Sequence, residues 1–216
     1  MQQPQDNITR ITAIRHGETA WNVATRIQGQ LDISLNETGH WQAEQAGKAL
    51  AGEKLDAIIS SDLARAYETA LAIAKHHALS IEVDHGLRER EFGSFQGKTF
   101  AEIEALLPEE AKLWRARVPD FSPGGGESLL IFRERVTQCL RRLAIQYAGK
   151  SIAIVSHGGV MDIIYREAMH LDLQAPRAWQ LGNASINRVM FNGAHFSLIG
   201  WSDTSHLTQG LDESHA

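Results

Sequence analysis

The sequence predicts an α/β protein, a three-layer α/β/α sandwich around a mostly parallel central sheet. Short runs rich in β-branched and apolar residues alternate with longer segments in which apolar residues recur every three or four positions. The run at 151–155 (SIAIV) is apolar almost throughout, as is typical of a central parallel strand covered on both faces. The run at 8–14 (ITRITAI) is followed at once by charge and glycine, which indicates a strand that leads into a loop.

The first β-loop-α-β unit is predicted to end with a strand at 56–60. Between the two strands, residues 38–51 carry apolar side chains at helical spacing. We expect this helix to stop at Gly52 in a left-handed C-terminal cap.

The next segments continue the alternation and then interrupt it. Asp62 is expected to cap a helix over 63–77, and 81–83 is predicted to form a short third strand. Residues 99–123 contain two short helical patterns broken by prolines. We interpret them as a helical insertion that covers the functional edge of the sheet.

The C-terminal half is predicted to hold the longest helix, at 128–148 and closed by Gly149. A further helix is expected from about 159 to 169. The runs at 185–191 and 196–201 predict a hairpin or a pair of edge strands, which could also pair subunits into a homodimer.

Composition limits the classes of function. The chain has 216 residues, 43% of them hydrophobic, which suits one domain over 1–216. A net charge of -5 argues against nucleic-acid and membrane partners. The polar start MQQPQDN lacks the features of a signal peptide, so we expect a cytoplasmic protein. The single Cys139 is expected to be buried and inert.

Chemically active residues follow the predicted strands. In open α/β sheets, ligands bind beyond the carboxyl ends of the strands. Two histidines, two arginines and one carboxylate are predicted to meet there: Arg15, His16, Arg65, Glu89 and His157. Helix starts near residues 63 and 159 should add backbone N–H groups.

This combination suits phosphoryl transfer without a metal. A phosphate monoester is a dianion near neutral pH, and arginine guanidinium groups supply the charge and directional donors that it needs. A neutral His16 can attack phosphorus, with Glu89 as the acid that protonates the leaving oxygen. Glu91 is the alternative acid. Gly158 lets the backbone approach the anion closely.

Structural roles are the alternative to these catalytic ones. A lone histidine at position 16 is typical of a protein core, and Arg65 alone would more often pair with Glu68 across a helical turn. The set of residues together favours catalysis. His76 and His77 must diverge from a helix, and no metal-ligand spacing is present, so we expect no metal and no cofactor.

At these residues the chain resembles the histidine phosphatase superfamily, which is phosphoglycerate mutase-like, in its small-molecule phosphatase branch. The resemblance covers nearly the whole length. The matching segments are RHGETAWN (15–22), RIQGQLDISLNETG (26–39), SSDLARAYETA (60–70), LREREFGSFQGK (87–98), PGGGES (123–128) and VSHGG (155–159).

The resemblance implies a role for each matched position. His16 would carry the phosphoryl group, and Glu89 would act first as acid and then as base toward water. The groups that would hold the phosphoryl group are Arg15, Arg65 and His157. Asn22 matches a further phosphate-contacting position, and Gln28 lies where a backbone or side-chain contact is common.

The choice of reaction depends on the segment after Glu89. It reads REFGSFQGKTF, which resembles the phosphatases and lacks the ERHYG run of the mutases. We therefore expect a phosphomonoester hydrolase acting on small phosphorylated metabolites. The alternatives are a 2,3-bisphosphoglycerate-dependent phosphoglycerate mutase, a non-catalytic phosphate-sensing or interaction module, and a phosphatase of protein side chains.

Substrate-binding residues outside this set are less defined. Lys98, Arg115 and Arg117 are candidates for a substrate carboxylate or second phosphate. The aromatic residues Phe95, Trp114 and Phe121 could line a substrate pocket or pack beneath the insertion.

Overall fold

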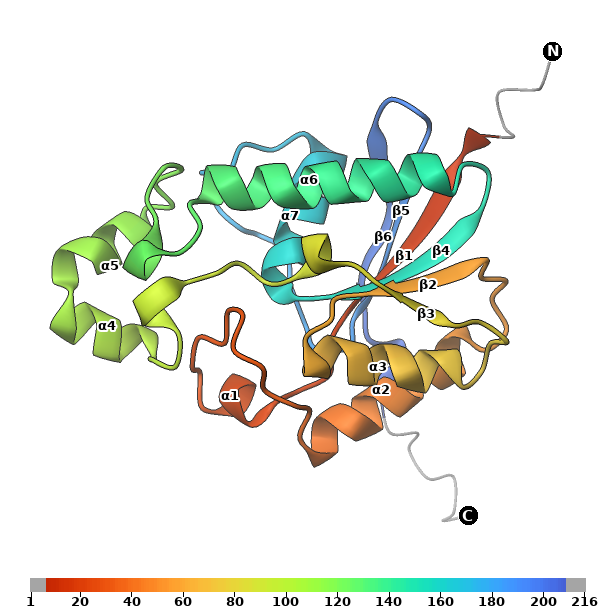
Figure 1. Ribbon diagram of the computed structural model, residues 1–216, viewed down its shortest axis with the longest axis horizontal. Coiled ribbons are helices and arrows are strands. Elements are labelled where there is room, and N and C mark those ends of the chain that lie inside the picture. The colour runs from red at the N-terminus through yellow and green to blue at the C-terminus, as the bar shows by residue number, and fades with distance from the viewer. Residues whose placement is uncertain (1–6, 209–216) are drawn as a thin grey trace, which may run out of the picture.

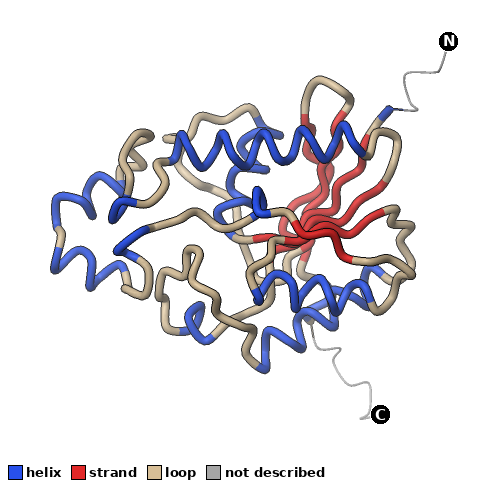
Figure 2. Tube along the Cα trace, viewed as in Figure 1, coloured by secondary structure: helices blue, strands red, loops and turns tan. Residues whose placement is uncertain are grey.

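The computed structural model describes residues 7–208 and shows a six-stranded sheet between two layers of helices (Figures 1 and 2). The strands are β1 (Thr9–Arg15), β2 (Ala57–Ser60), β3 (Ile81–Val83), β4 (Ser151–Ser156), β5 (Ile186–Phe191) and β6 (Phe196–Asp203). Their order is β3-β2-β4-β1-β5-β6, with the first four parallel and the last two antiparallel. This confirms the predicted sandwich and the hairpin after residue 185.

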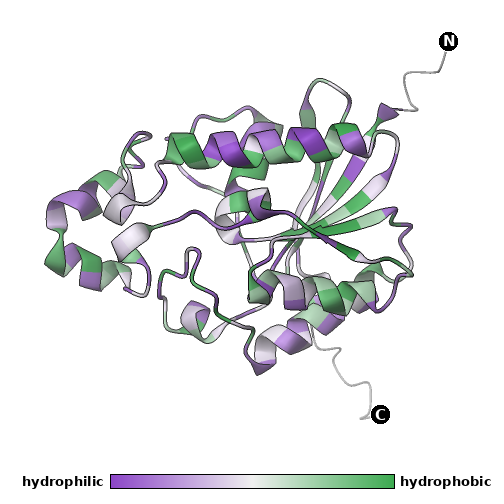
Figure 3. Ribbon diagram, viewed as in Figure 1, coloured by the Kyte–Doolittle hydropathy of each residue, from purple (hydrophilic) through white to green (hydrophobic). Residues whose placement is uncertain are grey.

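The helices cover both faces of the sheet. They are α1 (Ala20–Val23), α2 (Glu37–Leu50), α3 (Ala64–Ala74), α4 (Phe100–Leu106), α5 (Pro108–Arg115), α6 (Leu129–Gln146) and α7 (Gly158–Met169). In Figure 1, α6 and α7 lie on one face, and α2 and α3 lie on the other. Strand β4 is buried on both faces, and the middle of the sheet is hydrophobic (Figure 3).

Three predicted helix ends are wrong. Asp62 does not cap α3, because its carboxylate pairs with Arg88 instead; the side chain of Asp32 accepts the Ala64 N–H at 2.7 Å. Gly52 is not a left-handed cap, because α2 ends through a right-handed turn at Ala51 (φ -55°). Helix α3 also ends at Ala74, three residues earlier than predicted.

Other local predictions agree with the structure. Gly149 follows α6 with a φ of 79°, the left-handed conformation expected of it. Cys139 is buried, and burial together with Asp84 raises its pKa to about 12, so the thiol is inert at neutral pH. The short helix α1 was not predicted, although Thr19 and Asn22 form a capping box at its start.

The segment at 99–123 forms α4 and α5, which extend beyond the carboxyl edge of the sheet (Figure 1). The two helices pack around a small apolar cluster of their own, centred on Phe95 and Ile103. No helix among residues 7–208 is long and apolar enough to cross a membrane. Residues 1–6, on which the expected lack of a signal peptide largely depends, lie outside the described part of the chain.

Candidate active site

The centre of the site is a pair of histidines at the carboxyl ends of the two middle strands. His16 follows β1 and His157 follows β4, and these strands are parallel neighbours. Their ring centroids are 5.2 Å apart, and both residues are buried. The strand order therefore brings together two residues separated by 141 positions in the sequence.

The His16 ring is held in one tautomer. Its Nδ1 lies 2.7 Å from the carbonyl oxygen of Gly17, which can only accept a hydrogen bond. The hydrogen of the neutral ring is therefore on Nδ1, and Nε2 keeps its lone pair. Burial, with smaller contributions from Arg15 and Arg65, holds the pKa of His16 well below its ordinary value. The ring is neutral near pH 7, as a nucleophile must be.

Both predicted arginines retain an unused buried donor. Arg65 is fully buried and donates to the carbonyls of Leu31 (2.9 Å) and Gly29 (2.7 Å), while its Nε has no protein partner among the described residues. Arg15 donates to the Leu181 carbonyl, and its Nε is likewise unpartnered. Burial lowers the pKa of Arg65 to about 10, so the side chain remains a cation near neutral pH.

His157 is oriented by Ser61. The Ser61 hydroxyl lies 2.9 Å from Nε2 of His157 and accepts the Leu63 N–H at 3.3 Å. A hydroxyl proton given to Nε2 leaves the ring hydrogen on Nδ1, which is buried without a partner in residues 7–208. Burial, then Arg65, lowers the pKa of His157 well below its ordinary value. His157 is therefore a neutral donor beside His16.

Glu89 is fixed by two backbone amides. Its carboxylate accepts the N–H of Arg90 at 2.8 Å and the N–H of Gly159, in the first turn of α7, at 2.9 Å. A Cβ at position 159 would lie 2.1 Å from Glu89 Oε1, so only glycine leaves room for this carboxylate. The helix-terminal amide expected to bind substrate thus positions Glu89 instead. Glu91 is exposed and lines neither cavity at this edge of the sheet; its backbone N–H donates to Glu127.

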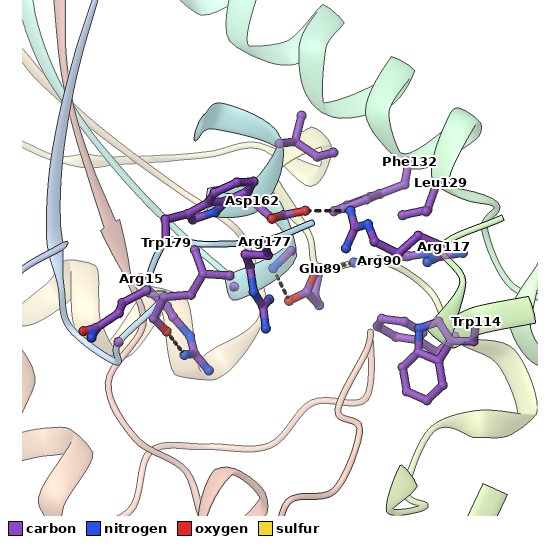
Figure 4. A pocket seen from close by; sticks show the side chains of 17 residues that line it. Arg15, Glu89, Arg90, Trp114, Arg117, Leu129, Phe132, Asp162, Arg177 and Trp179 are labelled. Carbon is purple, nitrogen blue, oxygen red and sulfur yellow. Dashed lines mark hydrogen bonds and ion pairs between the residues drawn. The ribbon is translucent and has the colours of Figure 1, made fainter. Parts of the chain in front are cut away.

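Two neighbouring cavities share Arg15, Glu89 and Phe92 in their walls. The smaller, about 200 Å³, is lined by six of the predicted site residues: Arg15, His16, Asn22, Gln28, Arg65 and Glu89. His157, which was also predicted to hold the phosphoryl group, is buried beside His16 but lines neither cavity. The larger, about 700 Å³, extends toward α5 and α7 and includes Gly158 (Figure 4). Gln28 is buried with its Oε1 unpartnered among the described residues.

The three other cations predicted to bind substrate, Lys98, Arg115 and Arg117, do not line the smaller cavity. Lys98 donates to the Ser94 carbonyl, and Arg115 pairs with Glu104 at 2.9 Å; neither lines the two cavities. Arg117 lines the larger cavity, but its guanidinium is engaged by Asp162 at 2.9 Å.

Of the three predicted aromatic residues, Trp114 lines the larger cavity. Its ring centroid lies 5.6 Å from that of Phe95, which is fully buried. Phe121 packs against the same apolar cluster. Phe95 and Phe121 therefore pack beneath the insertion and do not line the cavity.

Sequence reasoning missed several residues in the connection between α7 and β5. Asn183 donates to the carbonyls of His16 (3.0 Å) and Gly17 (3.2 Å), which fixes the backbone at His16. Arg177 and Trp179 line the larger cavity. This connection has no periodic pattern, so only its spatial position reveals these residues.

Comparisons with known proteins identify the family of this chain. The family model of the histidine phosphatase superfamily (branch 1) matches residues 11–204. The chain is 39% identical to the metal-independent phosphoserine phosphatase of Arabidopsis thaliana, over 94% of this chain and 85% of that protein. It is 38% identical to phosphoglycerate mutase-like protein 4 of the same plant, over 92% and 87%.

A solved structure is similar over the whole fold. A mutant phosphoserine phosphatase of Entamoeba histolytica, in complex with phosphoserine, has a TM-score of 0.83 and 31% identity, with 93% of this chain and 100% of that chain covered. Family model, sequence relatives and structure lead to the same assignment. This chain is an enzyme that belongs to the histidine phosphatase superfamily.

Proposed function

We propose that this enzyme hydrolyses phosphomonoesters of small metabolites through a phosphohistidine on His16. One observation carries the proposal: the neutral ring of His16 lies among buried donors that have no protein partner in the described residues, namely Arg15 Nε, Arg65 Nε and His157 Nδ1. Buried donors are costly unless a ligand accepts from them. A tetrahedral phosphoryl dianion supplies enough acceptors for all three.

In the first step, the lone pair on His16 Nε2 attacks phosphorus, and the bond between phosphorus and the leaving oxygen breaks. Protonated Glu89 gives its proton to that oxygen, so an alcohol leaves. Arg15 and Arg65 stay bound to the phosphoryl oxygens throughout, which stabilises their charge in the transition state. The carboxylate is suitably placed because it borders both cavities.

In the second step, Glu89 is a carboxylate and accepts a proton from water. The water oxygen attacks phosphorus, and the bond from phosphorus to Nε2 breaks, which returns the lone pair to His16. Inorganic phosphate leaves, and Glu89 is again protonated. Atoms and charge balance over the cycle, and no other reactant than water is needed.

Hydrolysis is favoured over the mutase alternative by the segment after Glu89 and by the phosphoserine phosphatase relatives. Because one relative is phosphoglycerate mutase-like, the experiment must also be able to detect mutase activity. Enzyme labelled with ³²P should lose its label to water as inorganic phosphate. Faster discharge onto 3-phosphoglycerate than onto water would assign a mutase instead.

The nucleophile is tested by acid-labile labelling from a ³²P phosphomonoester in the presence of EDTA. Wild type should be labelled and His16→Ala should not. His195→Ala is the matched control, because His195 is exposed and lies in the β5–β6 hairpin, away from the site. Equal labelling of wild type and His16→Ala would refute the proposed nucleophile.

A cytoplasmic location and a homodimer formed through the edge strand β6 are part of the same proposal. The exposed Ile199 on β6 supports pairing at that edge. Cell fractionation and size-exclusion chromatography with light scattering would test these two statements.

A further inference from the structure

The larger cavity has an excess of positive charge. Its wall includes four arginines and two carboxylates: Arg15, Arg90, Arg117, Arg177, Glu89 and Asp162. One phosphoryl group, held in the smaller cavity, does not use all of this charge. A second anionic group on the substrate would complement the remainder.

Two of these arginines are engaged by the protein itself. Arg90 donates to the carbonyls of Glu127 (2.8 Å) and Phe121 (3.2 Å). Arg117 binds Asp162 and donates to the carbonyl of Leu173 at 2.6 Å. Both hold the walls of the cavity together.

Arg177 differs from them. It makes no hydrogen bond or ion pair with residues 7–208, and it is exposed on the connection between α7 and β5. In Figure 4 its side chain lies in the cavity between Arg15 and Glu89. Burial is the main cause of the lowered pKa of Arg15, and the charge of Arg177 contributes, which indicates that the two cations are close. Arg177 is thus available for a ligand.

The direction of the substrate follows from the proposed function, on which this inference depends. The phosphoryl group occupies the smaller cavity, and the leaving oxygen must face Glu89, which lies in both walls. The rest of the leaving group then extends into the larger cavity, where Arg177 is located. A substituent near the phosphoester oxygen therefore meets Arg177 first.

We infer that Arg177 binds a carboxylate on the leaving group, so that the enzyme selects phosphomonoesters of small hydroxy acids. A guanidinium fork matches the two oxygens of a carboxylate. One free arginine suits a monoanion. A second phosphate dianion would require several unused donors, such as the smaller cavity provides for the first.

Two substrates that differ only at the relevant group test this inference. 3-Phosphoglycerate and glycerol 3-phosphate share a three-carbon skeleton with a terminal phosphate, but the first ends in a carboxylate and the second in a hydroxymethyl group. Wild type should have the higher kcat/KM for 3-phosphoglycerate. In Arg177→Met this value should fall on the order of 10- to 100-fold, mostly through KM, as for loss of a charge-assisted hydrogen bond.

The same substitution should affect glycerol 3-phosphate less than about threefold, and Arg177→Lys should recover part of the preference. Arg115→Gln is the control, because Arg115 is exposed, pairs with Glu104 and lines neither cavity. Where turnover of either ester is slow, both esters are compared as competitive inhibitors of p-nitrophenyl phosphate hydrolysis. The ratio of their inhibition constants then measures the preference for the carboxylate.

Three results would overturn the inference. They are no preference in wild type, no effect of Arg177→Met, or an equal loss for both esters, which would mean that Arg177 acts on the phosphoryl group or on Glu89. Failure of the proposed function is distinguishable, because then wild type would not hydrolyse p-nitrophenyl phosphate faster than His16→Ala.

Discussion

Replacement of Glu89 by glutamine separates proton transfer from phosphoryl binding. The amide keeps the shape of the carboxylate, but it cannot donate an acidic proton. Loss of a general acid typically costs about 10²- to 10⁴-fold in rate, or about 3 to 5 kcal/mol in the transition state. One of the two backbone amides, Arg90 N–H or Gly159 N–H, would also face the new NH₂ group instead of an oxygen. We therefore expect the upper half of that range.

The assay compares two leaving groups in a rapid-mixing burst. An alkyl phosphate leaves as an alkoxide that needs a proton, whereas p-nitrophenolate is stable as an anion. In Glu89→Gln, phosphorylation of His16 by the alkyl ester should slow by about 10³-fold or more, and by p-nitrophenyl phosphate less than about tenfold. Steady-state turnover of both should fall, because water attack also needs the base. Phosphoenzyme should accumulate from the aryl ester.

Glu91→Gln is the matched control, since Glu91 is the neighbouring exposed acid, and its side chain lines neither cavity. Its burst should equal that of wild type with both esters. Equal slowing of both esters in Glu89→Gln would show that Glu89 acts only by positioning. If Glu91→Gln instead slowed the alkyl ester much more than p-nitrophenyl phosphate, Glu91 would be the general acid.

Three further predictions concern the residues that orient and stabilise the site. Ser61→Ala should lower kcat about tenfold, since His157 then loses the hydroxyl at Nε2 that fixes its tautomer; an unchanged kcat would contradict this role. Asp162→Ala should destabilise the protein by about 3 kcal/mol in urea unfolding, because it leaves the guanidinium of Arg166 buried without its carboxylate; a loss below about 1 kcal/mol, typical of an exposed ion pair, would refute this. The lowered pKa values of His16 and His157 mean that, below about pH 6.5, the unfolded chain binds protons that the folded chain does not. Stability should then fall as pH falls below 6.5, by up to about 1.4 kcal/mol per pH unit for each histidine, and His16→Asn should reduce that slope.

The sheet and its functional edge could be predicted because both depend on local signals. Apolar runs of strand length, such as the one that became β4, are visible in the sequence, and a residue directly after such a strand lies at the carboxyl edge. This rule placed His16 and His157 at the same edge of the sheet without any contact information. Helix caps were harder to predict, because α3 is capped by Asp32, a residue 32 positions from the amide that it binds. A cap formed by so distant a residue leaves no recognisable pattern in the sequence around the helix.

The residues of the larger cavity could not be predicted by the same rules. Asn183 and Arg177 come from a connection that has no helix or strand, and nothing in their sequence neighbours indicates which carbonyl or cavity they meet. Arg117 shows the opposite case. It was a reasonable candidate for substrate binding by charge alone, but Asp162, on α7, pairs with its guanidinium. Whether an arginine is free for a ligand depends on its partners in space.

Two properties of the site come from the same pair of arginines. In the proposed function, Arg15 and Arg65 provide the charge that binds a phosphoryl dianion; their charge also contributes to the low pKa that keeps His16 neutral. A protonated His16 could not attack phosphorus, so the cations that attract the substrate also keep the nucleophile active before it arrives. Once the dianion is bound, it offsets these charges, and the positive charge that develops on the ring during attack becomes less costly. In the proposed mechanism, binding of the phosphoryl group therefore itself favours its transfer to His16.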